Sequence, residues 1–521
     1  MYRDPAVTCC LRVLSADAAS PDNDHAPGAT ITGLCENDIL RFTLVGWQRP
    51  YVYIDDIAVP PDPAGCFSWQ PGFVAGQVDI VVVDGALEHV FFVHIAASKA
   101  KLRAEVFDTM ADEVHAFRAA LLLGDTSATR QFGEEVCEGG LPLLVRLMRL
   151  LEHAPVFLQQ VRAICGAPHR KLQAVHDAVP LCRIRRLPAS ALRMPAIVAL
   201  ATGQRLDGQH AEHTRIPAWL PSPTFDTPSN RMLKALLCRV VAHATEILVE
   251  TRALRLGGDK VGQQQRLPRR EAQVQMILDE ARLLLRREPL ASVTRLETSA
   301  AGYTQVAAQP AYSRACRTAT KALWTGFGGA TDHEQLPIRP TWGVYEAWCF
   351  VHLMRRLEKV FGAGPWRTLL SGCAGADEAY ALTVAPGVAV EIYFQAIFHA
   401  RDRAPGSGKA WSISRQRIPD IVVVVRTGEH CRFVVLDAKF RKHRHNVLEA
   451  MESAHLYRDS LRIGAQRPGW CVLLLPASAD VPHLEGNAFL DEHGVGTFSV
   501  FSPEGVGVDA CIARIASWAS A

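Results

Sequence analysis

Two aspartates and a lysine flank two apolar runs that are typical of a β-hairpin. Asp420 opens the first run, and Asp437 and Lys439 close the second. Because alternate residues of a strand point to the same side, we expect Asp437 and Lys439 to share a face, with Asp420 close to them at the open end of the hairpin. Buried strands rarely carry charge without a partner. The three side chains therefore indicate either a salt bridge or a metal site.

A metal site at this position would suit phosphodiester hydrolysis. Two converging carboxylates repel each other unless one takes up a proton or a cation joins them, and oxygen ligands of this kind suit Mg²⁺ or Mn²⁺. Such a metal polarises a phosphoryl oxygen and lowers the pKa of a bound water. Lys439 could then orient the nucleophile or stabilise charge in the transition state.

Basic residues on both sides of the hairpin could hold a polyanionic backbone. They are Arg415, Arg417, Arg441, Lys442 and Arg444. The basic run after the hairpin is equally typical of a solvent-exposed segment that leads into a helix.

The elements that must position these residues follow from the hydrophobic pattern. An amphipathic helix is expected at 342–362, a strand at 387–398, a helix at 446–464 and an apolar strand at 469–476. With the hairpin between them, the order is helix, three strands, helix, strand. This order predicts an α/β domain in which helices cover a mixed sheet.

On that order of elements, "PD" at 419–420 and "DAK" at 437–439 resemble the signature of the PD-(D/E)XK nuclease superfamily. The resemblance implies a restriction-endonuclease-like fold and further residues around the site: Glu346, Glu391, Gln395 and Tyr457. Glu346, on the preceding helix, would be a third carboxylate for the metal. Gln395 or Glu391, on the strand before the hairpin, and Tyr457, on the helix after it, would support the site. The middle acidic residue is Asp437, where many members have the longer Glu.

Several short stretches narrow the resemblance. "YEAW", "RIPDIVV", "LDAKFR" and "HLYRDS", with "TFDTPSNRMLKALL" at 224–237, look like the McrC-like branch, in which a nuclease follows a domain of unknown function. The resemblance implies docking onto an AAA+ motor of the McrB type and prokaryotic defence against foreign DNA. The glycine-rich stretch at 406–410 lacks the spacing of a phosphate loop, so any nucleotide would bind to another polypeptide.

A chain of 521 residues is too long for one core, and its patterns predict three domains. Residues 1–100 read as a β-rich module. Residues 101–334 read as helical, with a long antiparallel hairpin formed by 229–256 and 270–288 around a polar loop at 257–268. Residues 335–521 are expected to form the α/β domain that the resemblance identifies as a nuclease. Asn230 and Arg231 are interpreted first as a helix cap and a structural salt bridge, and alternatively as a contact at the domain junction or with the motor.

The composition is that of an ordinary globular protein. The net charge is only +3, so any affinity for DNA must come from a local patch. The fourteen cysteines are scattered without a CxxC pair, which favours reduced thiols in a cytoplasmic protein over zinc sites or disulfides. No apolar run reaches about 18 residues, so no membrane span is expected.

Together these features predict a Mg²⁺- or Mn²⁺-dependent DNA endonuclease. Two alternatives stay open: a non-catalytic DNA-binding adaptor that stimulates an AAA+ motor, and a nuclease directed at RNA. Self-association of the chain into a homo-oligomer is a further open point.

Overall fold

The computed structural model describes most of the chain. Its description leaves out residues 1–8, 15–22, 86, 98–103, 125, 127, 133–142, 185–186, 188, 203–214, 258–260, 297, 299, 325–333, 363, 370–375, 377, 404–409, 429, 504 and 521. The chain divides into two compact units, Met1–Leu144 with Phe327–Ala521, and Val145–Gly326. The predicted boundaries near 100 and 334 fall in or beside stretches outside the described residues, and they stay predictions.

The first unit begins with the predicted β-rich region, which the structure confirms. One sheet has the order β2-β1-β4-β7, built from β1 (Cys10–Val13), β2 (Asn23–His25), β4 (Leu40–Val45) and β7 (Phe67–Trp69). The other contains β3 (Thr30–Cys35), β5 (Tyr51–Ile54), β6 (Ile57–Val59), β8 (Gly76–Asp84), β9 (Leu87–Ala96), β10 (Thr129–Phe132) and β13 (Glu334–Pro337). Alternate residues of β8 (Val78, Ile80 and Val82) are buried, as expected for a strand with one face in a core.

The C-terminal part of the first unit is an α/β domain around a mixed sheet. Its strand order is β14-β15-β16-β19-β20-β22-β23. The strands are β14 (Arg367–Thr368), β15 (Glu378–Ala385), β16 (Val388–Phe394), β19 (Ile421–Thr427), β20 (His430–Ala438), β22 (Pro468–Leu474) and β23 (Val495–Phe498). Pairing is antiparallel from β14 to β20 and parallel from β20 to β23. The mixed sheet is thus confirmed, and β14, β15 and β23 extend it beyond the predicted strands.

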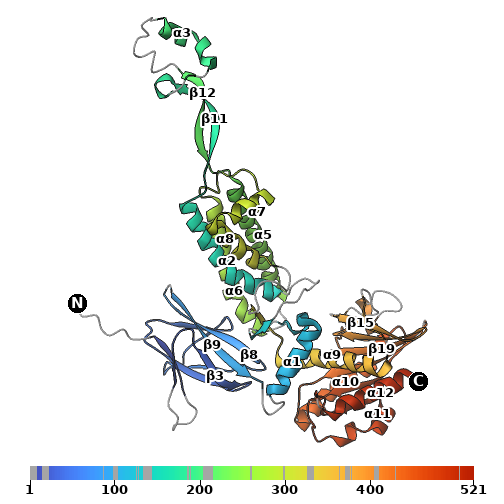
Figure 1. The fold of residues 1–521 in the computed structure, drawn as a ribbon. Coiled ribbons are helices and arrows are strands. Elements are labelled where there is room, and N and C mark those ends of the chain that lie inside the picture. The colour runs from blue at the N-terminus through green and yellow to red at the C-terminus, as the bar shows by residue number, and fades with distance from the viewer. Residues whose placement is uncertain are drawn as a thin grey trace. The chain divides into compact units, whose positions relative to one another are not determined.

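Helices cover this sheet, as Figure 1 shows in gold for α9 and in orange to red for the others. They are α9 (Thr341–Phe361), α10 (Arg444–Ser460), α11 (Asn487–His493) and α12 (Val506–Ser520). Val422 and Val424 of β19 share one core cluster with Val447 and Met451 of α10, which fixes α10 against one face of the hairpin. A small additional sheet contains β17 (His399–Ala400), β18 (Ala410–Ser412) and β21 (Leu461–Ile463).

Helix α1 (Ala104–Arg118) joins the front of the first unit to α9. The Glu113 carboxylate accepts a hydrogen bond from Trp348 Nε1 at 3.1 Å and lies 3.2 Å from His352 Nδ1. Arg118 at the end of α1 forms an ion pair of 2.8 Å with Glu378 of β15. The long helix α9 is therefore held by polar contacts as well as by its apolar faces.

The second unit is helical, as predicted for the middle of the chain. Its helices are α2 (Leu143–Gly166), α3 (Pro195–Ala201), α5 (Pro228–Gly257), α6 (Val261–Leu285), α7 (Ala300–Ala307) and α8 (Pro310–Ala322). Helices α5 and α6 pack along each other as the expected long hairpin. The polar loop predicted at 257–268 is wrong over most of its length, because α6 already begins at Val261 and continues through Pro268.

A β-ribbon interrupts the region that was predicted to be helical, and this is a second correction. β11 (Lys171–Pro180) and β12 (Arg215–Thr224) pair antiparallel along ten residues each, and Figure 1 shows them extending from the end of the helices. Most of β11 is exposed. The ribbon carries Pro217, Pro221 and Pro223 in one strand, which sequence reasoning takes as evidence against a strand. A two-stranded ribbon tolerates proline because each strand keeps an open edge.

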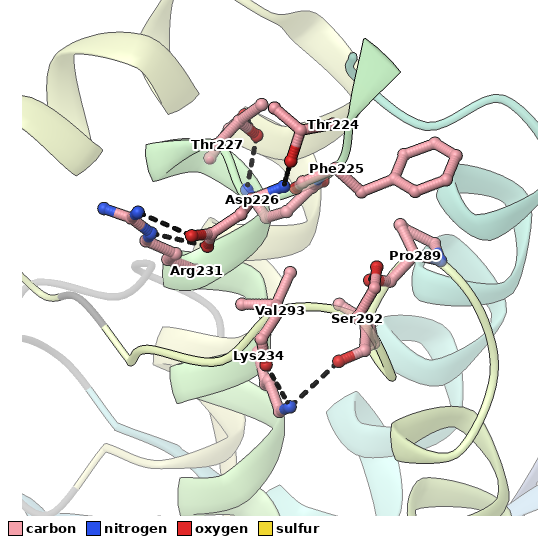
Figure 2. Close-up of polar contacts among 12 residues, drawn as sticks. Thr224, Phe225, Asp226, Thr227, Arg231, Lys234, Pro289, Ser292 and Val293 are labelled. Carbon is pink, nitrogen blue, oxygen red and sulfur yellow. Dashed lines mark hydrogen bonds and ion pairs between the residues drawn. The ribbon is translucent and has the colours of Figure 1, made fainter. Parts of the chain in front are cut away.

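The start of α5 confirms the structural salt bridge of Arg231, whereas the expected cap at Asn230 is wrong: the Thr227 hydroxyl caps the helix by accepting from the N–H of Asn230 at 3.3 Å. Figure 2 shows Arg231 facing Asp226, and two of its nitrogens lie 2.7 Å from the two carboxylate oxygens. The Asn230 amide is buried. It donates to the backbone oxygens of Phe225 and His169 and accepts from the Tyr312 hydroxyl at 2.5 Å.

The remaining short elements are the 3₁₀ turns Ala119–Leu122, Leu181–Arg183, Ala189–Arg193, Arg401–Arg403 and Pro482–Leu484. The cysteines that the structure describes are all free thiols. Within the described ranges, no helix is both long and apolar enough to cross a bilayer.

Candidate active site

The hairpin brings its three charged residues together. β19 and β20 pair with Ile421 opposite Leu436, so Asp420 and Asp437 meet at the open end. Lys439 Nζ lies 2.8 Å from Asp437 Oδ2 and 3.7 Å from Asp420 Oδ2. Asp420 Oδ2 also accepts a hydrogen bond of 2.9 Å from the N–H of Ala438. The lysine ammonium thus contacts both carboxylates of the pair.

Asp437 is the most enclosed of the charged residues. Its exposed fraction is 1%. The Ser453 hydroxyl on α10 donates to Asp437 Oδ2 at 2.6 Å, whereas the buried Oδ1 has no hydrogen-bond partner among the described residues. Ser453 was not predicted from the sequence. Its position one helical turn before Tyr457, on the same face of the helix, is the signal that could have pointed to it.

Glu346 and Gln395 approach from neighbouring elements. Glu346 lies on α9 with an exposed fraction of 6%, and Gln395 Nε2 is 3.5 Å from its Oε2. Gln395 follows β16 in a left-handed conformation with φ of 51°, and its N–H donates to the carbonyl of Asp420 at 2.7 Å. The backbone therefore fixes Gln395 beside the hairpin.

Glu391 does not take part in this group. Its carboxylate binds Arg426 at 2.6 Å and accepts a hydrogen bond from the Tyr393 hydroxyl at 2.7 Å. It lies opposite Val424, four residues along β19 from Asp420. Of the two residues expected on this strand, only Gln395 is placed next to Glu346.

Burial dominates the electrostatics of the acidic residues. Burial raises the pKa of Glu346 to about 7; the Lys439 charge opposes this rise and the Asp437 charge adds to it. Burial also raises the pKa of Asp420 well above its usual range, and the neighbouring carboxylates Asp437 and Glu346 act in the same direction. Burial would lower the pKa of Lys439, but the surrounding carboxylates outweigh it and the pKa is raised. Ionising all three carboxyl groups beside one lysine would leave excess negative charge in a poorly solvated place, and the raised pKa values of Glu346 and Asp420 reflect that cost.

Tyr457 lies on α10 within electrostatic reach of the same residues. Burial, followed by the charges of Asp437 and Asp420, raises the pKa of its phenol, while Arg417 opposes that rise. The phenol is therefore neutral at physiological pH and available as a hydrogen-bond donor. Arg417 itself is held by two backbone hydrogen bonds to Phe398.

A cleft of about 760 Å³ opens over the site. It is lined by Phe73, Trp342, Glu346, Ala438, Lys439, Phe440, Arg441, Lys442, His443, Asn446 and Glu449. Of the five basic residues predicted to bind DNA, Arg441 and Lys442 line it. Three of the five are not among its lining residues: the exposed Arg415, Arg417, whose backbone pairs with Phe398, and Arg444, which donates to the Asp480 carbonyl at 2.8 Å.

The donor set fits a hard divalent cation. Asp420, Asp437 and Glu346 supply carboxylate oxygens, and the buried Oδ1 of Asp437 points to no other described partner. No three His, Cys, Asp or Glu side chains within the described ranges are already gathered as a metal cluster. Instead, the Lys439 ammonium is the cation that contacts the aspartate pair.

A known protein family matches the front and middle of the chain. The family described as "Domain of unknown function (DUF2357)" matches residues 69–315, a range that ends before α9 and the Asp420 hairpin. No curated protein is similar enough to count as a match.

Two solved structures from Thermococcus gammatolerans show a weak likeness. One is a half-complex from a tetradecameric assembly of McrB AAA+ hexamers with bound McrC, at 14% identity and a TM-score of 0.23, covering 88% of this chain and 85% of that one. The other is the McrBC complex, at 13% identity and a TM-score of 0.19, covering 56% and 68%. These scores are too low to establish a shared fold.

Proposed function

We propose that this protein is a metal-dependent DNA endonuclease of the PD-(D/E)XK superfamily and the nuclease subunit of a McrBC-like prokaryotic restriction system. The observation that carries the proposal is the convergence of Asp420, Asp437 and Lys439 beside the buried Glu346. A purely structural ion pair needs one carboxylate, whereas Lys439 contacts two, and the buried Glu346 lies within electrostatic reach of both Lys439 and Asp437. Excess buried carboxylates are what a divalent cation would compensate.

In this proposal Asp420, Asp437 and Glu346 hold Mg²⁺ or Mn²⁺. When bound, the metal supplies Lewis-acid polarisation of the phosphodiester and makes a water more acidic. Ser453 keeps the Asp437 carboxylate in one orientation by donating to its Oδ2. The other oxygen, Oδ1, has no hydrogen-bond partner among the described residues and would be the metal ligand. Gln395 orients the Glu346 carboxylate in the same way.

Lys439 is proposed as the catalytic cation. Its ammonium lies at the open end of the hairpin and lines the cleft, so it can reach a phosphate bound there. Its raised pKa keeps it protonated at physiological pH, and the proposed role is therefore to stabilise negative charge on the phosphoryl oxygens rather than to accept a proton.

DNA as substrate and an AAA+ partner are proposed on different grounds. Arg441 and Lys442 supply positive charge in the same cleft as Lys439, which suits a phosphate backbone. The partner of the McrB type and the cytoplasmic setting rest on the motifs shared with the McrC-like branch, including the stretch at 224–237.

One observation favours a second function. The 2.8 Å ion pair between Lys439 and Asp437 already neutralises part of the acidic group. A protein that uses this fold only to bind DNA would need such a neutralised site, because it would hold no metal there. A non-catalytic adaptor that stimulates an AAA+ motor would use the basic cleft in the same way. Cleavage separates the two functions.

The test is cleavage of supercoiled plasmid DNA and of an RNA of equal length in Mg²⁺, with and without the AAA+ partner. Wild type is compared with Asp437→Ala and Lys439→Ala. We expect nicked and linear DNA only with the wild type, and a circular substrate shows that the cut is endonucleolytic. Equal behaviour of wild type and both variants in every condition would favour the adaptor, and cleavage confined to RNA would change the substrate.

A further inference from the structure

Two large aromatic side chains are exposed in the cleft above the candidate active site. Phe73 has an exposed fraction of 49% and Trp342 one of 46%. Single exposed apolar side chains are common on protein surfaces. These two, however, line the same cleft as Glu346 and Lys439, together with Arg441 and Lys442.

The two aromatic residues come from distant parts of the chain but are fixed to each other through the backbone. Phe73 lies in the segment between β7 and β8, directly after Gly72, whose φ of 73° is in the left-handed region. The Phe73 carbonyl accepts a hydrogen bond of 3.2 Å from the N–H of Thr341 and lies 3.5 Å from its hydroxyl. Thr341 is the first residue of α9 and the neighbour of Trp342. The first turn of α9 therefore holds both aromatic residues in place.

The spacing along α9 relates Trp342 to the proposed chemistry. Trp342 and Glu346 are four residues apart, so they share a face of the helix. The rise between them is about 6 Å, which is on the scale of one or two nucleotides of a single strand. A nucleotide whose phosphate lies near Glu346 and Lys439 would thus place a base of the same strand, one or two positions away, near Trp342.

We infer that the cleft takes a nucleotide with an unpaired base, which stacks on Trp342 and Phe73 beside the scissile phosphate. Aromatic rings in a basic groove stack on bases without regard to sequence, because every base has a π face. In an intact duplex both faces of a base are covered by its neighbours. The protein therefore prefers DNA that is locally melted or single-stranded at the cut. This inference rests on the proposed nuclease function.

The test compares two 40-base-pair DNAs of the same sequence, one fully paired and one with a central unpaired bubble that carries 2-aminopurine. Binding to the full-length protein is measured by fluorescence in Ca²⁺, and cleavage in Mg²⁺. The variants are Trp342→Ala, Phe73→Ala and the conservative Trp342→Phe. Tyr51→Ala, which removes an exposed aromatic residue of β5 that does not line the cleft, is the control.

We expect the wild type and Tyr51→Ala to bind and cut the bubble in preference to the duplex and to quench 2-aminopurine. Each alanine variant in the cleft should lose roughly 5- to 150-fold in bubble affinity with little change for the duplex, and Trp342→Phe should restore most of it. Circular dichroism shows whether the alanine variants are folded. If Trp342→Ala does not fold, the affinity of Trp342→Phe for the bubble still tests the same position.

The inference and the proposed function fail in different ways. If the wild type cuts DNA but does not distinguish bubble from duplex, or if the cleft variants keep the wild-type preference, the stacking inference is wrong and the nuclease stands. If the wild type cuts neither DNA but quenches 2-aminopurine, and Trp342→Ala abolishes the quenching, the stacking site holds and the nuclease proposal falls.

Discussion

Replacing Glu346 by Gln is expected to stabilise the metal-free protein at alkaline pH while removing cleavage. Burial raises the pKa of Glu346 from its usual 4.5 to about 7, so the folded state binds this proton more tightly than the unfolded state does. Folding stability is therefore unaffected below pH 4.5, falls as the pH rises from 4.5 to 7, and stays reduced above pH 7. At about 1.36 kcal/mol per pKa unit, the full penalty is about 3 kcal/mol. Glutamine carries no charge and escapes it.

The assay is differential scanning calorimetry in EDTA between pH 5 and pH 8.5, which can separate the transition of the unit that holds Glu346 from that of residues 145–326. At roughly 2 °C per kcal/mol, Glu346→Gln should melt about 6 °C higher than the wild type at pH 8.5, and the gain should shrink towards pH 5. Glu358→Gln, the same change near the far end of the same helix, is the matched control and should show no such gain. A Glu346→Gln variant no more stable than wild type at pH 8.5, or one with the same gain at every pH, would refute the reasoning.

Three further predictions concern contacts around this site and at the start of α5. Ser453→Ala removes the 2.6 Å hydrogen bond to Asp437 and should slow cleavage roughly tenfold without unfolding the protein, a claim that an unchanged rate in single-turnover assays would overturn. Arg441→Ala should weaken DNA binding and lower the slope of log affinity against log salt concentration by about one. Arg444→Ala, whose side chain binds a backbone carbonyl outside the cleft, should change both quantities less. Fluorescence anisotropy at several salt concentrations measures both, and the opposite order would show that DNA does not bind in the cleft. Asn230→Ala leaves buried groups without partners and should cost about 1–3 kcal/mol, seen as a lower melting temperature of the second unit, and an unchanged melting temperature would disagree.

Local pattern was enough to predict the elements that carry the charged residues. The run of valines after Asp420 and the run before Asp437 are short, rich in β-branched residues and separated by a turn, which favours adjacent strands, and the alternation of side chains then placed Lys439 on the face of Asp437. The helical period around Glu346 placed α9 within one residue at each end. These features depend on neighbours in the sequence and can therefore be predicted from it.

Features that depend on contacts between residues far apart in the chain could not be predicted from the local sequence. Phe73 meets the cleft only because its carbonyl binds Thr341, a contact between residues far apart in the chain. The ribbon strand that contains Pro217 also carries Pro221 and Pro223, which argue against a strand, and its partner β11 is exposed on both faces over most of its length. Pro268 was read as the end of a loop, but the helix accommodates it. Tertiary structure overrides local propensity at each of these places.

The dependence of plasmid cleavage on Mg²⁺ concentration, measured for the wild type and for Asp437→Asn with and without the AAA+ partner, tests the proposed metal site most directly. We predict a rate that saturates with Mg²⁺ for the wild type, no cleavage in EDTA, and a loss of at least about a hundredfold in the variant, because Asn keeps the shape of the side chain but not its charge. A wild type that cuts equally well in EDTA, or an Asp437→Asn variant that cuts as fast as the wild type, would contradict the assignment of these carboxylates to a catalytic metal.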